Sequence, residues 1–245
     1  MPVKPIRSAA RTLEAIEVIA RHQPIGVGEL ARRLGDDKSN VQRVLVTLAS
    51  AGWIQALPEG PTRWELTTRV QAVASDAQAR TGLGTLIRSL MVSLRDRTGE
   101  TVICAVPDVD RVVITDVVES TQMVRSAPSV GLVVPTETSA SGCALLAAMD
   151  RPARERLAGH ELAEPVHKEL DAFRRRGWSL SIAGDVGQGS TNLGAAVLAE
   201  SGEPVAAIAI SAVSSRMPPR EQQRVGRILA EAVAALPLPS LTGGH

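Results

Sequence analysis

Residues 36–53 read DDKSNVQRVLVTLASAGW, and this stretch decides the fold of the N-terminal part of the chain. Its apolar residues recur at positions i, i+3, i+4 and i+7, a spacing that lines one face of an α-helix. Asp37 is a suitable N-cap for this helix, and Gly52 stands where the helix would end. The stretch therefore predicts a helix with one buried stripe. The stripe consists of Val41, Val44, Leu45 and Leu48.

The opposite face of this helix is polar and short. A rigid helix that offers amide, hydroxyl and guanidinium groups can read base edges in the major groove of DNA. Asn40 and Gln42 would pair with adenine, and Arg43 with guanine. The outward but apolar Val46 would touch a thymine methyl group. The alternative is an ordinary surface helix with a solvated face. The base-reading candidates are Ser39, Asn40, Gln42, Arg43 and Val46.

The flanking sequence favours the DNA-binding interpretation. Helical spacing of apolar residues upstream, and short β-prone runs around a Pro- and Gly-containing segment downstream, predict three helices followed by a β-hairpin. This order makes a winged helix-turn-helix. Lys38, Arg63 and Arg69 would then contact phosphates, because charge at a helix start or near a wing positions the protein without reading sequence. The flanking elements are helices at residues 8–21 and 27–34, a turn at 35–36, and strands at 53–55 and 63–66 joined by a turn at 58–62.

The composition of the 245 residues indicates a globular protein of two modest domains. The formal net charge is only +1, but residues 1–80 hold 11 Lys and Arg against 8 Asp and Glu, whereas the remainder holds 16 against 18. This asymmetry permits phosphate binding by the N-terminal third. With no Tyr, one Phe and three Trp, the chain lacks the rings of a base-stacking platform, so binding of single strands or RNA is not expected.

Several other classes of protein are not expected. The sequence has no apolar run of transmembrane length and no signal peptide, so we expect a cytoplasmic protein without membrane contact. It has no P-loop and no HExxH, and residues 187–189 (GQG) lack the third glycine of a dinucleotide fingerprint. The four His show no metal-ligand spacing. We therefore expect no enzyme activity, no metal and no cofactor. Cys104 and Cys143 are expected to be reduced core thiols.

The rest of the chain predicts an α+β domain with antiparallel strands and helices on the faces of the sheet. The predicted boundaries are 1–67 for the winged helix-turn-helix, 68–82 for a linker helix, 83–238 for a sensor domain and 239–245 for a frayed tail. In the sensor domain we expect helices at 83–98, 142–149, from 150 onward, 166–176 and 218–236, and strands at 101–106, 111–119, 122–126, 178–182, 193–199 and 205–212.

Over nearly its whole length the chain resembles the IclR family of bacterial transcriptional regulators. The N-terminal likeness lies in RTLEAIEVIARHQPIGVGELARRLG and DKSNVQRVLVTLASAGWI, and the C-terminal likeness in VGLVVPTETSASGCALLAAM, FRRRGWSLS and VAAIAISAVSSRM. The resemblance implies a winged-helix domain, a linker helix and an effector-sensing domain similar to the GAF fold. It also implies homodimers through the DNA-binding domains, often tetramers through the sensor domains, and control of operons for degrading aromatic or small organic compounds.

The resemblance implies an effector pocket, but this chain departs from the family pattern around it. Asn192 stands where many members have Cys, and Glu137 and Cys143 occupy positions often held by His and Lys. Ala196 replaces a common Pro, and residues 182–189 lack the usual acidic stretch. The identity of the effector therefore does not transfer. The implied pocket residues are Met123, Ala140, Ser141, Ser190, Asn192, Ala209 and Ser211.

The residues themselves suggest an anionic effector. Backbone amides at the start of the helix near Ser141 would form an anion site, aided by the helix dipole. Hydroxyls of Ser139, Ser141 and Ser211 would add donors, which supports a small carboxylate. The alternative is that these serines only cap the helix. An aromatic or apolar ligand is equally compatible with the sequence, because Met123, Leu132 and Val134 are apolar.

Two functions remain open at this point. The first is a sequence-specific DNA-binding regulator controlled by a small organic effector. The second is a regulator whose sensor domain is ligand-independent or responds to thiol oxidation through Cys143 or Cys104. The sequence names neither the operator nor the effector, and it does not distinguish repressor from activator.

Overall fold

The computed structural model describes residues 6–58, 60–79, 83–181 and 189–236. By its internal contacts the chain divides into two compact units, Met1–Arg80 and Thr81–His245. The predicted tail at 239–245, the end of the predicted linker helix at 80–82 and most of the 182–189 loop lie outside the described residues.

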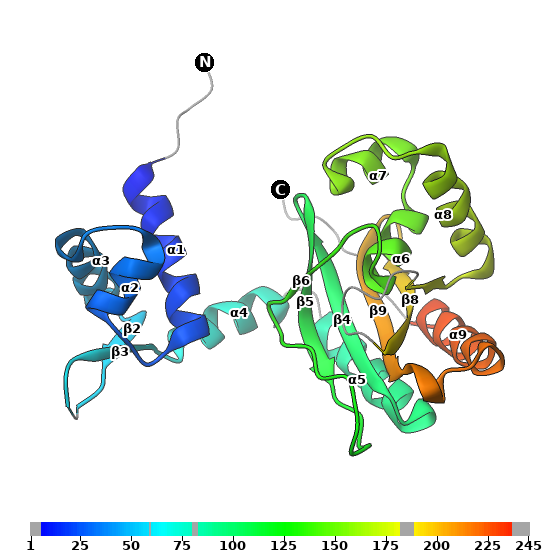
Figure 1. Cartoon of the computed structure of the whole chain (residues 1–245), viewed down its shortest axis with the longest axis horizontal. Coiled ribbons are helices and arrows are strands. Elements are labelled where there is room, and N and C mark those ends of the chain that lie inside the picture. The colour runs from blue at the N-terminus through cyan, green and yellow to red at the C-terminus, as the bar shows by residue number, and fades with distance from the viewer. Residues whose placement is uncertain (1–5, 59, 80–82, 182–188, 237–245) are drawn as a thin grey trace. The chain divides into compact units, whose positions relative to one another are not determined.

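The first unit is the winged helix-turn-helix that the sequence predicted, followed by one further helix (Figure 1). Its small antiparallel sheet has the strand order β1-β3-β2, so β3 is the central strand of the wing. Its elements are α1 (Arg7–His22), β1 (Ile25–Gly26), α2 (Val27–Leu34), α3 (Lys38–Ser50), β2 (Ile54–Ala56), β3 (Arg63–Leu66) and α4 (Arg69–Ala79).

Local sequence sets the angle between α2 and α3. Gly35 ends α2 in the left-handed conformation (φ 61°), and its N–H donates to the carbonyls of Ala31 and Arg32. That conformation suits glycine because it has no Cβ. Asp37 then caps α3, as predicted, by accepting from the backbone N–H groups of Ser39 and Asn40. The core below this turn contains Ile19, Leu30, Leu34, Val41, Leu45, Leu48 and Ile54, with Trp53 and Trp64 packed against it.

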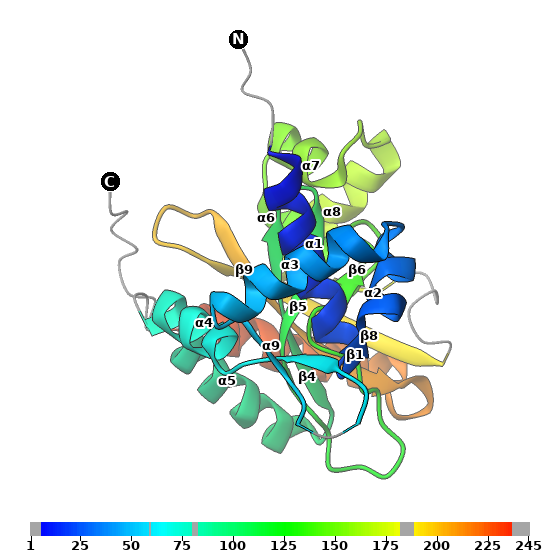
Figure 2. The ribbon, with the colours of Figure 1, turned by 90° about the vertical axis from the view of Figure 1, so that its left-hand side faces the viewer.

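The second unit contains a six-stranded antiparallel sheet of order β6-β5-β4-β9-β8-β7 between two layers of helices (Figure 2). The predicted α+β class is therefore confirmed. Its helices are α5 (Leu83–Thr98), α6 (Ala140–Ala148), α7 (Arg151–Ala158), α8 (Glu164–Arg176) and α9 (Pro219–Ala234), with a 3-10 turn at Ser214–Arg216. Its strands are β4 (Thr101–Asp108), β5 (Arg111–Val118), β6 (Val133–Val134), β7 (Ser179–Leu180), β8 (Ser190–Leu198) and β9 (Pro204–Val213).

Alternation along the central strands divides the core in two. Val102 and Cys104 of β4 face α5 and α9, whereas Ile103 and Ala105 of the same strand face the layer of α6, α7 and α8. Successive side chains of a strand point to opposite faces, so both faces of the sheet are covered. One predicted strand is wrong. Residues 122–126 form no strand, and the sheet instead ends at β6, which pairs through Val112↔Val134 and Val113↔Val133.

Candidate DNA-binding surface and sensor cavity

The outward face of α3 presents free side chains along its length. Gln42 and Arg43 are exposed, and Val46 is 55% exposed. Among the described residues, the side chains of Gln42 and Arg43 have no hydrogen-bond or ion-pair partner. These three residues therefore form a surface on α3 that is available to base edges.

Ser39 and Asn40 behave differently, because both take part in capping α3. The Ser39 hydroxyl donates to Asp37 Oδ1 at 2.8 Å, and Asn40 Nδ2 donates to Asp37 Oδ2 at 2.7 Å and to Asp36 Oδ1 at 3.2 Å. Donation from the Asn40 backbone N–H, followed by the Ser39 hydroxyl, lowers the pKa of Asp37. Base reading by Ser39 or Asn40 would compete with this network.

The predicted phosphate-binding cations lie around α3 and the wing. Lys38 begins α3 and is exposed. Arg63 Nη2 lies 3.9 Å from Glu29 Oε2 and remains half exposed. The guanidinium of Arg69 stacks over the Trp53 ring, 5.7 Å from its centroid, which holds the start of α4 against the wing.

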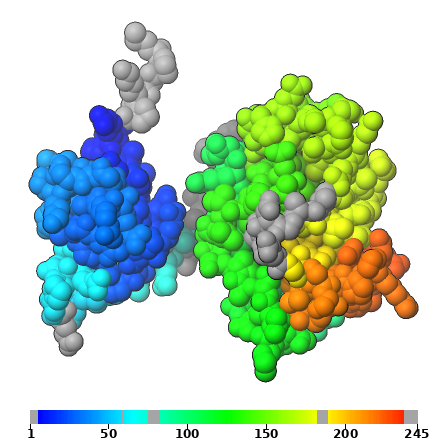
Figure 3. Space-filling view, viewed as in Figure 1, coloured from blue at the N-terminus to red at the C-terminus, as the bar shows by residue number. Residues whose placement is uncertain are grey.

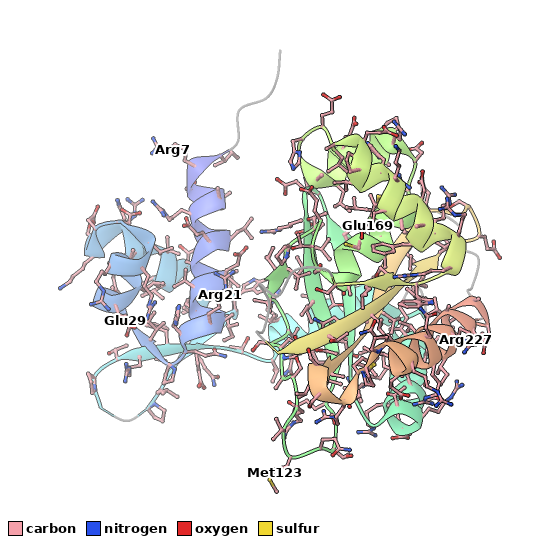
Figure 4. All side chains as sticks on the ribbon, turned by 45° about the vertical axis from the view of Figure 1, so that its right-hand side comes forward. Arg7, Arg21, Glu29, Met123, Glu169 and Arg227 are labelled. Atoms are coloured by element: carbon pink, nitrogen blue, oxygen red, sulfur yellow. The ribbon has the colours of Figure 1, made fainter. Side chains whose placement is uncertain are left out.

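Arg11 has a structural role. Its Nη1 donates to the Leu34 carbonyl at 2.8 Å, and its Nε lies 3.2 Å from Asp36 Oδ2. The side chain therefore joins α1 to the turn before α3. Arg7 lies at the start of α1 and points away from it (Figure 4). A broad open groove of about 970 Å³ runs between this part of α1 and α3.

The second unit holds a cavity of about 60 Å³ between the start of α6 and the sheet. The structure brings five of the seven implied effector residues together in its wall, namely Ala140, Ser141, Asn192, Ala209 and Ser211. Sequence reasoning did not place Ile103, Ile114, Ser126, Pro128 or Ser181 there, because these wall residues come from segments whose pairing with α6 is non-local.

Two implied effector residues lie outside this wall. Ser190 accepts a hydrogen bond from Asn192 Nδ2 at 3.4 Å and lies next to the cavity. Met123 is 95% exposed and points away from the unit at a loop (Figure 4). Two hydrogen bonds hold the backbone of this loop. Arg216 Nη1 donates to the Val124 carbonyl at 3.1 Å, and the Thr101 hydroxyl donates to the Ser126 carbonyl at 2.7 Å.

The hydroxyls of Ser141 and Ser211 have no protein partner and open onto the cavity, since no fully buried polar side-chain atom of the described residues lacks a partner. Ser141 is 6% exposed and Ser211 is 2% exposed, and neither hydroxyl has a hydrogen-bond partner within the described part of the chain. Ser139 is the true cap, since its hydroxyl accepts from the Gly142 N–H at 3.0 Å. The Ser141 hydroxyl is in the first turn of α6 and the Ser211 hydroxyl is on β9, and both line the cavity, where they can donate to or accept from a polar ligand or water.

Among the described residues that line the cavity there is no Lys or Arg, so these residues would hold an anion through hydroxyls and the N–H groups of the first turn of α6. Within the described residues no group of His, Cys, Asp and Glu could hold a metal ion. No helix in the same residues has the length and apolar character to cross a membrane.

The cysteines are poorly suited to redox sensing. Cys143 is 1% exposed and donates its thiol to the Glu137 carbonyl at 3.0 Å, and burial raises its pKa to about 12. Burial also raises the pKa of Cys104. The two residues belong to cores on opposite faces of the sheet. Since the thiolate is the reactive form, this environment opposes the thiol-redox alternative.

Comparison with known proteins gives consistent matches over both units. The family model described as "IclR helix-turn-helix domain" matches residues 8–58, and "Bacterial transcriptional regulator IclR C-terminal" matches residues 76–237. The "Transcriptional repressor IclR" of Escherichia coli is 27% identical over 95% of this chain and 89% of its own length.

Solved structures share the fold. An IclR transcriptional regulator from Alicyclobacillus acidocaldarius is 21% identical, with a TM-score of 0.81 over 95% of this chain and 98% of that one. An IclR homologue from Microbacterium hydrocarbonoxydans, solved in complex with 4-hydroxybenzoate, is 19% identical, with a TM-score of 0.78 over 94% and 97%.

Proposed function

Because this chain belongs to the IclR family of bacterial transcriptional regulators, a family of DNA-binding proteins, we propose that it binds one operator duplex specifically and that a small carboxylate in the α6 cavity modulates this binding. In this proposal residues 1–67 read DNA, 68–82 link the units, and 83–238 sense the effector. The operator lies in the bacterial cytoplasm, and we place the protein there.

The exposed face of α3 supports the DNA-binding part of the proposal. Gln42, Arg43 and Val46 are the base-reading residues that remain free, and Lys38 and Arg63 are the phosphate contacts nearest to them. Ser39 and Asn40 would have to share their donor groups with the Asp37 cap, and Arg69 would contact phosphate from its position over Trp53. We therefore assign sequence reading mainly to the middle of α3.

Replacement of Arg43 by Ala is expected to weaken specific DNA binding about tenfold or more, because a bidentate contact to guanine is lost. Gln42→Ala should have a similar effect at an adenine. The measurement is a mobility shift with the promoter region of the protein's own gene, against random duplex as competitor. Arg21→Ala is the matched control, since Arg21 pairs with Glu17 at the far end of α1. Equal loss in both Arg variants would contradict base reading by Arg43.

The unpaired hydroxyls of Ser141 and Ser211 carry the effector part of the proposal. A ligand carboxylate could accept from both and from the first N–H groups of α6. The cavity, at about 60 Å³, is small. This size favours a short aliphatic carboxylate over an aromatic one such as 4-hydroxybenzoate, the ligand of the Microbacterium homologue.

Replacement of Ser211 by Ala is expected to lower the affinity for such a carboxylate by roughly tenfold, since a hydrogen bond to a charged group is lost. Calorimetric titration with carboxylates of two to four carbons, and with 4-hydroxybenzoate, measures this. Ser190→Ala on the neighbouring strand β8 is the control, because Ser190 lies outside the cavity wall. If no carboxylate binds, or if both variants lose affinity equally, the assignment of the cavity is wrong.

The family resemblance and the surface of α1 support a homodimer through the first units. Ile6 and Leu13 are 70% and 63% exposed, and apolar side chains on an exposed helix are suited to a partner. A tetramer would need a further interface in the second unit. Sedimentation equilibrium of the native protein distinguishes monomer, dimer and tetramer.

A further inference from the structure

The sheet of the second unit has an open edge at β8. β7 is the outermost strand, but it covers β8 only through the pairs Ser179↔Gly194 and Leu180↔Leu193. No described strand pairs with β8 beyond Gly194 on this side. The uncovered part contains Ala195, Ala196, Val197 and Leu198 and has no charged residue.

Arg176 and Gly177 lie just before β7. The Arg176 Nε donates to the Trp178 carbonyl at 2.6 Å, and its guanidinium stacks 3.7 Å from the centroid of the Trp178 ring. Since the Ser181 N–H bonds to β8, alternation makes residue 177 the next that could pair with it. The chain turns away at Gly177, which adopts φ 81°.

Ala196 leaves backbone groups free at this edge. The Asn192 carbonyl accepts from the Ser181 N–H at 2.9 Å, and the Gly194 carbonyl accepts from the Ser179 hydroxyl at 3.2 Å. Alternate residues of a strand direct their N–H and C=O groups to the same side, so those of Ala196 point to the open edge. Proline at an edge would remove such a donor, whereas Ala196 keeps it.

Pockets lined mainly by apolar residues flank the open edge on both faces of the sheet. On one side, α6, α8 and β8 enclose about 260 Å³, with Phe173, Trp178 and the small side chains of Ala144 and Ala147 in the wall. On the other, α9 and β8 enclose about 600 Å³, and Glu231 of α9 lies in that wall, so an acidic flank is favoured only on the α8 side. Both pockets share Ala195, Ala196 and Leu198. The yellow atoms of β7 and β8 lie between the yellow-green of α8 and the orange of α9 (Figure 3).

An exposed arginine lies beside the α8-side pocket. Arg174 lines the α8-side pocket, is exposed, and has no ion-pair partner among the described residues. Arg175 follows it on α8 and is also exposed but lines neither pocket. An occupant of the edge would therefore gain from an acidic group near α8.

We propose that the β8 edge binds an extended, apolar peptide segment with an acidic flank, supplied by a partner protein. The peptide backbone pairs with Ala196, and its alternate side chains enter the pockets beside α8 and α9. This is strand addition, in which main-chain hydrogen bonds give affinity and the pockets give specificity. The exposed Arg174 beside the α8-side pocket favours a partner with an acidic flank as the occupant.

The test uses fluorescence anisotropy of the full-length protein with one labelled probe, the N-acetylated, C-amidated peptide Asp-Glu-Val-Phe-Ala-Val-Thr. Saturable binding is expected. Ala196→Pro should weaken it roughly tenfold or more, since it removes a backbone donor and places a ring at the edge. Arg174→Glu should weaken it, and the matched Arg175→Glu should not. Circular dichroism checks that each variant is folded.

Modified probes separate backbone pairing from nonspecific apolar binding. Only alternate residues of an added strand face β8, so N-methylation at one of the two central positions (Phe or Ala) should abolish binding, while methylation at the other is tolerated. Equal effects at both positions, or an Ala196→Pro variant that binds normally, would overturn the proposal. So would absence of binding at millimolar peptide. Self-association that Ala196→Pro abolishes, without peptide binding, would assign the edge to a second copy instead.

Discussion

Replacement of Gly142 by Ala is expected to destabilise the second unit by about 3 kcal/mol or more, because the site has no room for a methyl group. A Cβ at Gly142 would lie 2.1 Å from the Thr136 carbonyl oxygen and 2.6 Å from its carbonyl carbon. Both are backbone atoms, so the clash cannot be relieved by rotating a side chain. The segment before α6 would have to move, and with it the cavity wall at Ser139 and Ala140.

Thermal unfolding followed by circular dichroism measures this effect. Gly28→Ala is the control, since its Cβ would meet only the flexible end of Lys38, at 3.4 Å, inside helix α2. That variant should be neutral or slightly stabilising, because Ala favours a helix over Gly. A Gly142→Ala protein that melts within about 2 °C of the native one would show that the contact between Thr136 and α6 is wrong.

Replacement of Arg154 by Met is expected to cost about 2–3 kcal/mol, because buried acceptors lose a charged donor, while the half-exposed Asp171 is solvated by water. Arg154 is 2% exposed. Its Nε donates to the Leu146 carbonyl at 2.8 Å, near the end of α6, and its Nη2 donates to Asp171 Oδ1 at 2.7 Å. It thus ties α6, α7 and α8 together. His167 is also near, with its Nδ1 3.3 Å from Arg154 Nη1. Met fills similar space but leaves both the Leu146 carbonyl and His167 without the guanidinium.

The same helix offers a matched control. Arg151→Met removes a guanidinium that pairs with Glu164 at 3.0 Å, but both side chains are more than half exposed. Exposed pairs contribute little, so this variant should unfold at nearly the native denaturant concentration. Urea unfolding of the two variants side by side gives the comparison. Similar midpoints for both would mean that Arg154 is not the anchor described here.

The sequence predicted the first unit well because its signals are local. The stripe of α3, the cap at Asp37 and the glycine after α2 each depend on residues that lie close together in the sequence. The sequence did not reveal that the cap would also take up the side chains of Ser39 and Asn40. That outcome depends on two adjacent carboxylates, Asp36 and Asp37, competing for the same donors.

Prediction was weaker where the structure depends on distant residues. Residues 122–126 look like a strand, but their loop is held by side chains of Arg216 and Thr101 rather than by strand pairing. The open edge of β8 is likewise absent from any local pattern, because strand order decides which strand is left uncovered. The effector residues were inferred from the family resemblance. Met123 departs most from that expectation, because its side chain is exposed rather than buried in the cavity wall.

The distribution of tryptophan gives the protein a built-in optical probe. Without Tyr, its near-ultraviolet emission comes almost wholly from Trp53 and Trp64 in the first unit and Trp178 in the second. A Trp178→Phe variant would therefore emit only from the winged unit, next to α3. In that variant, a change in emission on adding a carboxylate that binds beside α6 would be a direct optical signal of communication between the two units.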